Sequence, residues 1–342
     1  MRIKIAGTGS YAPEHVVTNE DLAGIVDTSD EWIKSRTGIS QRRISDGIGT
    51  SGMAVKASER ALANAGMKAE EIQLILLATS TPDCHFPSGA CQVQGELGAV
   101  HAAAYDISAA CSGFLFALNT AYSFIISGFY RNVLVIGADC LSKVVDWSDR
   151  STCVLFGDGA GAAVVTGEAG GQGGDFGKPC VEQGSGCVPG ASGILHMIMG
   201  ADGWKGPVLS CESRTVGNFL TGTKPEMGYL SMDGQEVFKF AVKKMPEVIE
   251  QLLEESGMKL EQVKYLVLHQ ANYRISESIA KRLKISMERI PMNISRYGNT
   301  SAGSVPLLLD ELNREGKLKE GDLLVLAGFG AGLTWGAALI RW

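Results

Sequence analysis

The segment Ile72-Gln-Leu-Ile-Leu-Leu-Ala-Thr79 decides the fold class, because a close copy, Val263-Lys-Tyr-Leu-Val-Leu-His-Gln270, recurs later in the chain. Each copy is a short and nearly continuous apolar run, which is typical of a strand buried on both faces of a sheet. Internal similarity at a fixed separation indicates duplicated structure. The recurrence therefore predicts two similar halves, each built around its own sheet.

Three further pairs of segments recur in the same order along the chain. The members of the first two pairs are separated by almost the same number of residues as the two strand copies. The three pairs are Ala110-Cys-Ser-Gly113 with Thr300-Ser-Ala-Gly303, the apolar runs 132–138 and 322–328, and the Gly-rich turns leading into apolar strands at 156–165 and 329–340. A short strand precedes each member of the first pair, and an apolar helix follows it. We therefore expect an α/β protein whose halves pack on one another through buried helices.

The halves do not divide the chain evenly. The stretch Gly167–Gly206 holds 13 of the 43 glycines in the chain and shows little periodicity. We interpret it as an insertion made of loop, either an exposed excursion or a wall near a substrate entrance. The predicted division is residues 1–166 for the first half, 167–227 for a Gly-rich insertion and connection, and 228–342 for the second half.

Composition excludes several classes of protein. With 45% hydrophobic and 20% charged residues, the 342-residue chain can form a large core, which excludes disordered and coiled-coil proteins. A net charge of −6 argues against nucleic-acid or membrane partners. The N-terminus has no signal-peptide pattern, and the cysteines form no CxxC pair or metal-ligand spacing with the histidines. We expect a cytoplasmic protein with reduced thiols and no metal.

Cys111 is the candidate nucleophile. It stands between the strand-like run 102–108 and the helix-like run 113–126, among residues small enough for a sharp turn. A thiol at a helix N-terminus faces unpaired N–H groups, which favours the thiolate. The alternative is that Cys111 is one more small buried apolar residue.

The duplication directs attention to His269 and Asn299. His269 ends the second copy of the buried strand, and Asn299 begins the turn that matches the one holding Cys111. If the halves pack about a pseudo-twofold axis, the ends of matching strands converge, and these three side chains meet in one pocket. The alternatives are a core histidine and a simple turn residue.

Three glycine motifs are similar to dinucleotide-binding fingerprints: Gly7-Thr-Gly9, Gly157-Asp-Gly-Ala-Gly161 and Gly328-Phe-Gly-Ala-Gly332. Such a fingerprint requires a helix directly after the glycines. The second and third motifs lead into strand-like sequence, and the first leads to Pro13. We therefore expect no nucleotide cofactor.

Several motifs together resemble the β-ketoacyl-acyl-carrier-protein synthase III family of the thiolase superfamily, and the resemblance runs almost end to end. It implies a duplicated βαβαβ fold in five α-β-α-β-α layers and a homodimer. The motifs are Gly7-Thr-Gly-Ser-Tyr-Ala-Pro13, Asp30-Glu-Trp-Ile33, Arg36-Thr-Gly-Ile39, Ala109-Ala-Cys-Ser-Gly113, Phe156-Gly-Asp-Gly-Ala160, His269-Gln-Ala-Asn272, Gly298-Asn-Thr-Ser301 and Phe329-Gly-Ala-Gly-Leu-Thr-Trp335.

The resemblance implies a two-step condensation without a permanently bound cofactor. Cys111 takes an acyl group from acyl-CoA, and malonyl-acyl-carrier protein then loses CO₂ and attacks the acyl-enzyme. His269 and Asn299 would donate hydrogen bonds to the malonyl thioester oxygen. Backbone N–H groups of Cys111 and Ala331 would form a second oxyanion site.

The resemblance also assigns binding residues. A net charge of +4 between Gln270 and Gly298 suits an acidic carrier protein, although a solvated helix face gives the same pattern. By family match the CoA contacts are Thr28, Trp32, Arg36, Arg150 and Asn272, with the adenine between Trp32 and Arg150. The acyl pocket has Phe86, from the partner subunit, and Phe329. The carrier protein docks on Lys239, Arg274, Lys281 and Arg282.

The resemblance also distinguishes this family from its relatives by the residues Cys111, His269 and Asn299. Elongating synthases have a Cys/His/His set at these positions, and thiolases use a second cysteine near the C-terminus. No cysteine follows Cys211. Three departures from the family pattern are the insertion, Gln235 in place of a common Asn, and Ala331 in place of a frequent Gly. We expect a short-chain starter such as acetyl-CoA. The alternatives are a starter-condensing enzyme of secondary metabolism and a non-catalytic acyl-CoA or carrier-protein binding subunit.

Overall fold

The computed structural model describes residues 2–168, 192–212, 217–218, 220–224, 226 and 228–342. Over these residues two large sheets form, with strand orders β1-β7-β6-β4-β5 and β11-β12-β13-β8. The first comprises β1 (Arg2–Tyr11), β4 (Leu74–Ala78), β5 (Ala103–Ile107), β6 (Asn132–Asp139) and β7 (Gly159–Glu168). The second comprises β8 (Gly193–Ala201), β11 (Val263–Leu268), β12 (Leu323–Gly330) and β13 (Thr334–Arg341). Small pairs form from β2 (Val16–Thr18) with β3 (Gln41–Arg43), and from β9 (Leu209–Cys211) with β10 (Leu230–Met232).

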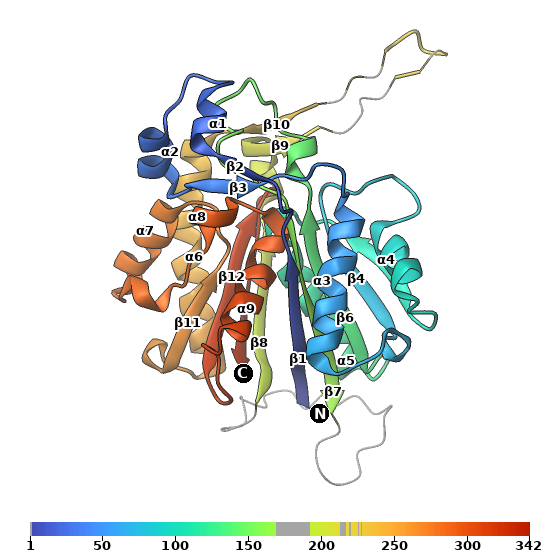
Figure 1. The fold of residues 1–342 in the computed structure, drawn as a ribbon. Helices are drawn as coiled ribbons and strands as arrows, with labels where there is room; N and C mark the ends of the chain where they lie inside the picture. The colour runs from blue at the N-terminus through green and yellow to red at the C-terminus, as the bar shows by residue number, and fades with distance from the viewer. Residues whose placement is uncertain (1, 169–191, 213–216, 219, 225, 227) are drawn as a thin grey trace.

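The helices complete five layers (Figure 1). Two helices, α5 (Gly113–Ile126) and α9 (Ser304–Arg314), lie between the sheets and share one apolar core with both. The outer face of the first sheet packs against α3 (Thr50–Ala65) and α4 (Gly89–Leu97), and that of the second against α6 (Gly234–Ser256) and α7 (Tyr273–Leu283). Shorter helices are α1 (Asn19–Ala23), α2 (Asp30–Thr37) and α8 (Ile294–Tyr297). The predicted α-β-α-β-α architecture is confirmed.

The duplication is clear in the backbone, because the starts of β6 and β12 are separated by the same length of chain as the starts of α5 and α9. Short 3₁₀ turns precede both buried helices, η2 (Ala110–Ser112) and η7 (Ser301–Gly303). Each turn begins with a non-glycine residue in the left-handed region, Ala110 at φ 47° and Ser301 at φ 50°. The sequence match of Cys111 with Ser301 is therefore wrong by a single position, and Cys111 corresponds to Ala302.

The stretch predicted to be loop contains a strand. β8 pairs antiparallel with β13, as β1 pairs with β7, so it is the first strand of the second half. The expectation of loop over 167–206 is therefore wrong for Gly193–Ala201. The glycines of this strand allow close packing rather than turns, since a Cβ at Gly200 would overlap the Trp335 ring. We propose that the second half begins at Gly193. The rest of the predicted insertion, with Cys180 and Cys187, lies largely outside the described residues.

No helix within the described part of the chain has the length and apolar character needed to cross a membrane. The two sheets enclose the buried helices. The carboxyl ends of the strands β4, β6, β11 and β12 lie at the same end of the molecule (Figure 1). Ligand sites of α/β folds form at such strand ends.

Candidate active site

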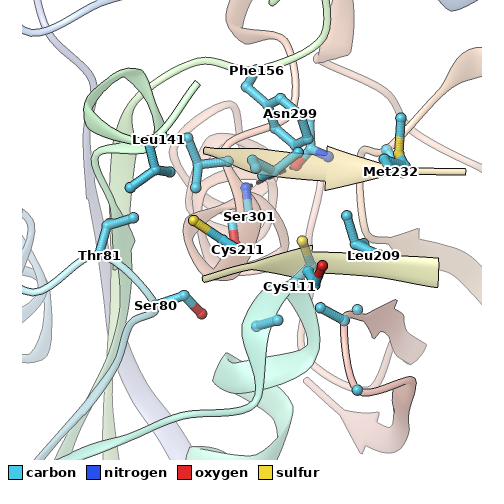
Figure 2. Close-up of a pocket in the computed structure, with 18 of the residues that line it drawn as sticks. Ser80, Thr81, Cys111, Leu141, Phe156, Leu209, Cys211, Met232, Asn299 and Ser301 are labelled. Carbon is cyan, nitrogen blue, oxygen red and sulfur yellow. Dashed lines mark hydrogen bonds between the residues drawn. The ribbon is translucent and has the colours of Figure 1, made fainter. Parts of the chain in front are cut away.

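A cavity of about 1040 Å³ opens where the strand ends of the two halves meet. Cys111 from the first half lines it together with His269 and Asn299 from the second. Figure 2 shows Cys111 and Asn299 directed into this space, with Ser301 between them. The structure therefore brings together the three side chains that the duplication singled out.

Cys111 lies on η2, between β5 and α5; the residue as a whole is partly exposed, while its thiol is desolvated. The strained Ala110 backbone turns the chain sharply before it, a conformation that costs on the order of 1–3 kcal/mol and is common at functional sites. Strand β12 passes close to this turn because Gly330 has no side chain. A Cβ at Gly330 would lie 2.6 Å from the backbone nitrogen of Cys111.

The Cys111 thiol is held in its protonated form. Burial is the main effect and raises its pKa to about 12, and the charge of Asp139 acts in the same direction. A hydrogen bond with the Ser301 side chain and the backbone N–H of Cys111 itself act in the opposite direction. The expectation that the helix N-terminus makes a thiolate is wrong here, because burial of the thiol outweighs the hydrogen bonds that favour its charged form.

His269 follows β11, and its backbone N–H donates to Ala327 O at 2.8 Å. The side chain is buried, and its ring meets Phe329 edge-on at 5.7 Å between centroids. Burial lowers the pKa of His269 to about 3, so the ring is neutral at physiological pH. Its Nδ1 is buried without a hydrogen-bond partner.

Asn299 is held by backbone contacts with the first half. Its N–H donates to Leu155 O at 2.9 Å, and its carbonyl accepts from Gly157 N at 3.0 Å. The side-chain oxygen accepts from Ser301 N at 2.9 Å. Because the oxygen of the carboxamide is engaged in this way, its NH₂ group is the part left to act as a donor.

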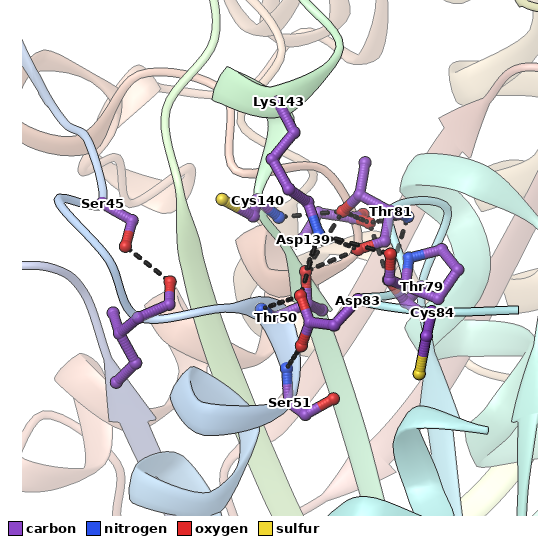
Figure 3. A network of polar contacts seen from close by, with 12 residues as sticks. Ser45, Thr50, Ser51, Thr79, Thr81, Asp83, Cys84, Asp139, Cys140 and Lys143 are labelled. Carbon is purple, nitrogen blue, oxygen red and sulfur yellow. Dashed lines mark hydrogen bonds and ion pairs between the residues drawn. The ribbon is translucent and has the colours of Figure 1, made fainter. Parts of the chain in front are cut away.

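A buried carboxylate joins the two halves beside the site, and sequence reasoning missed it. Asp139, at the end of β6, accepts from Thr79, Ser80 and Thr81 through Oδ1, and from Ala302 N at 3.2 Å through Oδ2. Figure 3 shows it among the contacts with Thr79 and Thr81. It therefore fixes η7, the turn that carries Ser301. An acid at the end of the apolar run 133–138 was the only signal in the sequence.

A second carboxylate fixes the loop at the cavity mouth (Figure 3). Asp83 accepts from Thr50 N and Ser51 N at the start of α3, and pairs with Lys143 at 2.9 Å. These contacts lower the pKa of Asp83 although its partial burial opposes them. Cys84 and His85 of this loop line the cavity, whereas Phe86 does not line it and is 87% exposed.

Of the predicted CoA contacts, Asn272 lines the cavity. Its side chain caps α7 by accepting from Arg274 N, and its NH₂ donates to Arg36 O at 3.1 Å. Trp32 and Arg150 lie outside the lining, with the guanidinium 5.3 Å from the indole centroid. A base inserted between them would have to separate the two groups. Thr28 Oγ1, also outside the lining, is buried without a hydrogen-bond partner.

The apolar wall of the cavity was largely missed by sequence reasoning. Phe329 and Ala331 line it as predicted, but further wall residues come from η3 (Leu141–Lys143) and from β9 and β10. They are too scattered along the chain to form a motif. The residues that Figure 2 shows around the thiol are Leu141, Phe156, Leu209, Cys211 and Met232.

The four residues predicted to dock a carrier protein lie on the adjacent helices α6 and α7. Three have acidic neighbours: Lys239 pairs with Glu236, Lys281 with Glu277, and Arg282 with Glu247. Arg274 lies over the Phe238 ring at 5.6 Å. In the part of the chain that the structure describes, no cluster of His, Cys, Asp and Glu could hold a metal ion.

Comparison with known proteins supports this picture. Two family models match: 3-oxoacyl-[acyl-carrier-protein] synthase III over residues 105–178, and its C-terminal model over 253–342. The β-ketoacyl-[acyl-carrier-protein] synthase III of Clostridium acetobutylicum is 48% identical over 99% of this chain and 98% of its own. The crystal structure of the Aquifex aeolicus enzyme superposes with a TM-score of 0.88 at 48% identity, covering 99% and 100% of the chains. A priming β-ketosynthase of the R1128 polyketide pathway gives 0.87 at 35% identity, covering 99% and 96%.

Proposed function

The chain belongs to the β-ketoacyl-acyl-carrier-protein synthase III family, and we propose that it condenses an acyl-CoA with malonyl-acyl-carrier protein to start fatty acid synthesis. The products are 3-oxoacyl-acyl-carrier protein, CoA and CO₂. The observation that carries this proposal is the meeting of Cys111, His269 and Asn299 in one cavity between the halves. A nucleophilic thiol needs a reducing compartment, so we place the enzyme in the cytoplasm.

The first step is acyl transfer to Cys111. The sulfur attacks the thioester carbonyl, the bond to the CoA sulfur breaks, and the thiol proton ends on CoA. Because the resting thiol has a raised pKa, this step needs the stabilisation that substrate binding and the Ser301 hydrogen bond supply. The backbone N–H groups of Cys111 and Ala331 receive the developing oxyanion. The Thr334 hydroxyl supports this arrangement because it lies within hydrogen-bond distance of both Ala331 O, at 3.0 Å, and Ala109 O, at 3.2 Å.

The second step is decarboxylation of the malonyl group. Loss of CO₂ builds negative charge on the thioester oxygen, and the carbanion then attacks the acyl–Cys111 carbonyl. One proton is taken up, and the thiol is released. A neutral imidazole and a carboxamide suit this step because both donate hydrogen bonds without carrying charge. We assign these roles to His269, through Nε2, and to Asn299.

Acyl-CoA enters past α2 and the turn that carries Arg150. The adenine stacks between Trp32 and Arg150, whose contact in the free protein indicates that both faces are suited to stacking. Thr28, Arg36 and Asn272 complete this path, and the buried hydroxyl of Thr28 is a candidate hydrogen-bond group for the ligand. The acidic carrier protein docks on the surface of α6 and α7 that carries Lys239, Arg274, Lys281 and Arg282.

The enzyme acts as a homodimer. Strand β5 is an edge of the first sheet with Tyr105 37% exposed. Phe86 is 87% exposed, and it shortly precedes Gly89, whose N–H donates to Asp106 of this strand. An uncovered edge strand readily pairs with another chain. A second copy placed there would cover this edge and receive Phe86 in its acyl pocket, next to Phe329.

The test is incubation with labelled acetyl-CoA, followed by intact-mass and peptide mass spectrometry. An acetyl adduct on Cys111 is expected, and it is expected to be absent in Cys111→Ala. Asn299→Ala is expected to acylate normally but to decarboxylate malonyl-carrier protein on the order of 10²–10³ times more slowly. A panel of longer and branched acyl-CoAs that left no adduct on Cys111 would favour a non-catalytic binding subunit instead.

A further inference from the structure

Arg42 is a fully buried arginine that forms no ion pair within the described residues. It lies on β3, and its guanidinium contacts only neutral acceptors. One nitrogen donates to Asn19 Oδ1 at 2.8 Å and Val17 O at 3.2 Å, and the other donates to Val154 O at 2.8 Å. Its Nε is buried without a partner.

Such an arrangement is costly. A buried charge is normally paired, because the loss of hydration costs several kcal/mol per ion. Burial lowers the pKa of Arg42 to about 10, so the group stays charged at physiological pH. An apolar residue of similar length would fill the same volume without this cost. The arginine therefore requires a reason beyond packing.

The aliphatic part of Arg42 lies against the segment that holds Asn299. A Cβ added at Gly157 would lie 3.1 Å from the Cβ of Arg42, and one at Gly298 would lie 3.3 Å from it. These two glycines flank the bridge between Phe156 and Asn299. Arg42 thus contacts both sides of the bridge at once.

The guanidinium fixes the same segment from its other end. It binds Val154 O, and the next carbonyl, of Leu155, accepts the backbone N–H of Asn299. Gly157 N then donates back to Asn299 O. The position of the Asn299 backbone therefore depends on where the 154–157 segment lies. Arg42 ties this segment to β3 through its side chain, and the next residue, Asp158, adds a backbone bond from its N–H to Arg43 O at 2.8 Å.

The opposite end of the guanidinium is anchored by an amide. Asn19 accepts from Arg42, and its own NH₂ donates to Asp30 Oδ1 at 2.9 Å and Ile39 O at 2.8 Å. An amide with three fixed partners offers one orientation only. This gives the guanidinium a defined place without a hydrogen bond to a carboxylate, although the charge of Asp21 also acts on it.

We propose that Arg42 is a positioning residue for Asn299, holding the 154–157 segment so that the carboxamide faces the malonyl thioester. The inference rests on the proposed function, since it assigns Asn299 to decarboxylation. Arg42 itself does not line the cavity. It serves the second half-reaction through Asn299 and leaves the acylation of Cys111 unaffected.

The test separates the two half-reactions in the full-length protein. Arg42→Met removes the charge at similar length, and Arg42→Lys keeps the charge but cannot hold both anchors. Because a 1 Å misplacement of a reacting group can cost about 10²-fold, we expect malonyl decarboxylation to fall about 10- to 100-fold in Arg42→Met and less in Arg42→Lys. Acylation of Cys111 by acetyl-CoA, and its KM, should stay within about twofold of wild type.

A double-mutant cycle makes the test specific. In an Asn299→Ala background Arg42→Lys should cause no further loss, because the residue that it positions is gone. Arg60→Lys is the control. Arg60 lies on the outer helix α3, where its guanidinium donates to Ser10 O of β1, and its replacement should leave both half-reactions unchanged.

Three results would overturn the proposal: unchanged decarboxylation in Arg42→Lys and Arg42→Met, equal loss of both half-reactions, or a raised acetyl-CoA KM with decarboxylation intact. If Arg42→Met does not fold, Arg42→Lys and its double-mutant cycle with Asn299→Ala still test whether Arg42 positions Asn299. Failure of the proposed function is a separate outcome, since the wild-type protein would then neither acylate Cys111 nor decarboxylate the malonyl group.

Discussion

Gly330→Ala is expected to disable Cys111 without changing any group that reacts. A Cβ at this position would lie 2.6 Å from the backbone nitrogen of Cys111, 3.1 Å from that of Ser112 and 3.2 Å from the Cβ of Ala110. Ordinary contact begins at 3.4 Å, so strand β12 and the η2 turn would have to separate by about 0.8 Å. Two of the three atoms are backbone and cannot rotate away.

The size of the effect follows from that displacement. The methyl group both shields the N–H proposed for the oxyanion site and moves the sulfur. Loss of one oxyanion donor or a shift of this size each lowers a rate by roughly 10²-fold, so acylation should fall by about that factor. Overpacking at a buried turn should also lower the free energy of unfolding by about 1–3 kcal/mol.

The assay is the rate of acetyl transfer from labelled acetyl-CoA to Cys111, followed by intact-mass spectrometry well below the thermal midpoint. Gly95→Ala in α4 is the matched control, because a Cβ there meets nothing within 4 Å. It should leave the rate unchanged. If Gly330→Ala acylates within threefold of wild type while remaining folded, the close approach of β12 does not control this site and the reasoning is refuted.

Three further predictions concern charge and stacking. Ser301→Ala removes a hydrogen bond that lowers the pKa of Cys111, so the pH midpoint of its alkylation by iodoacetamide should rise, and a fall would contradict the role of Ser301. Asp139→Asn removes a charge that raises this pKa, so the midpoint should fall, and a rise would contradict the role of Asp139. Trp32→Ala should raise the KM for acetyl-CoA about 5- to 30-fold through loss of about 1–2 kcal/mol of stacking, with kcat little changed. Lys281→Glu should raise the KM for malonyl-carrier protein, an effect that weakens with salt, while acylation is unaffected; a salt-independent change would count against electrostatic docking.

The duplicated architecture was predictable because it leaves periodic signals. Strand runs such as 72–79 and 263–270 are apolar in both halves, and the small residues around Cys111 mark the turn. The pairing of Cys111 with His269 and Asn299 followed from the same symmetry. Strand β8 escaped prediction because the glycines that allow its close packing, such as Gly200 beneath Trp335, look like loop composition in the sequence.

The supporting groups of the site were not predictable in the same way. Asp139 and Arg42 belong to no motif, and their partners lie far away in the chain: Ala302 is 163 residues from Asp139, and Val154 is 112 residues from Arg42. A residue that acts through such contacts can be recognised only when the segments are seen together.

The amino-acid sequence alone determined which reactive groups are present and that they stand at matching ends of repeated strands, because periodicity and residue type are local properties of a chain. The tertiary structure decided the state of those groups. Cys111 is protonated and His269 is neutral because packing removes water from both, and a helix-terminus argument made from sequence had the opposite sign for the thiol. Desolvation depends on every segment that surrounds a group, so it arises only when the two halves close upon each other.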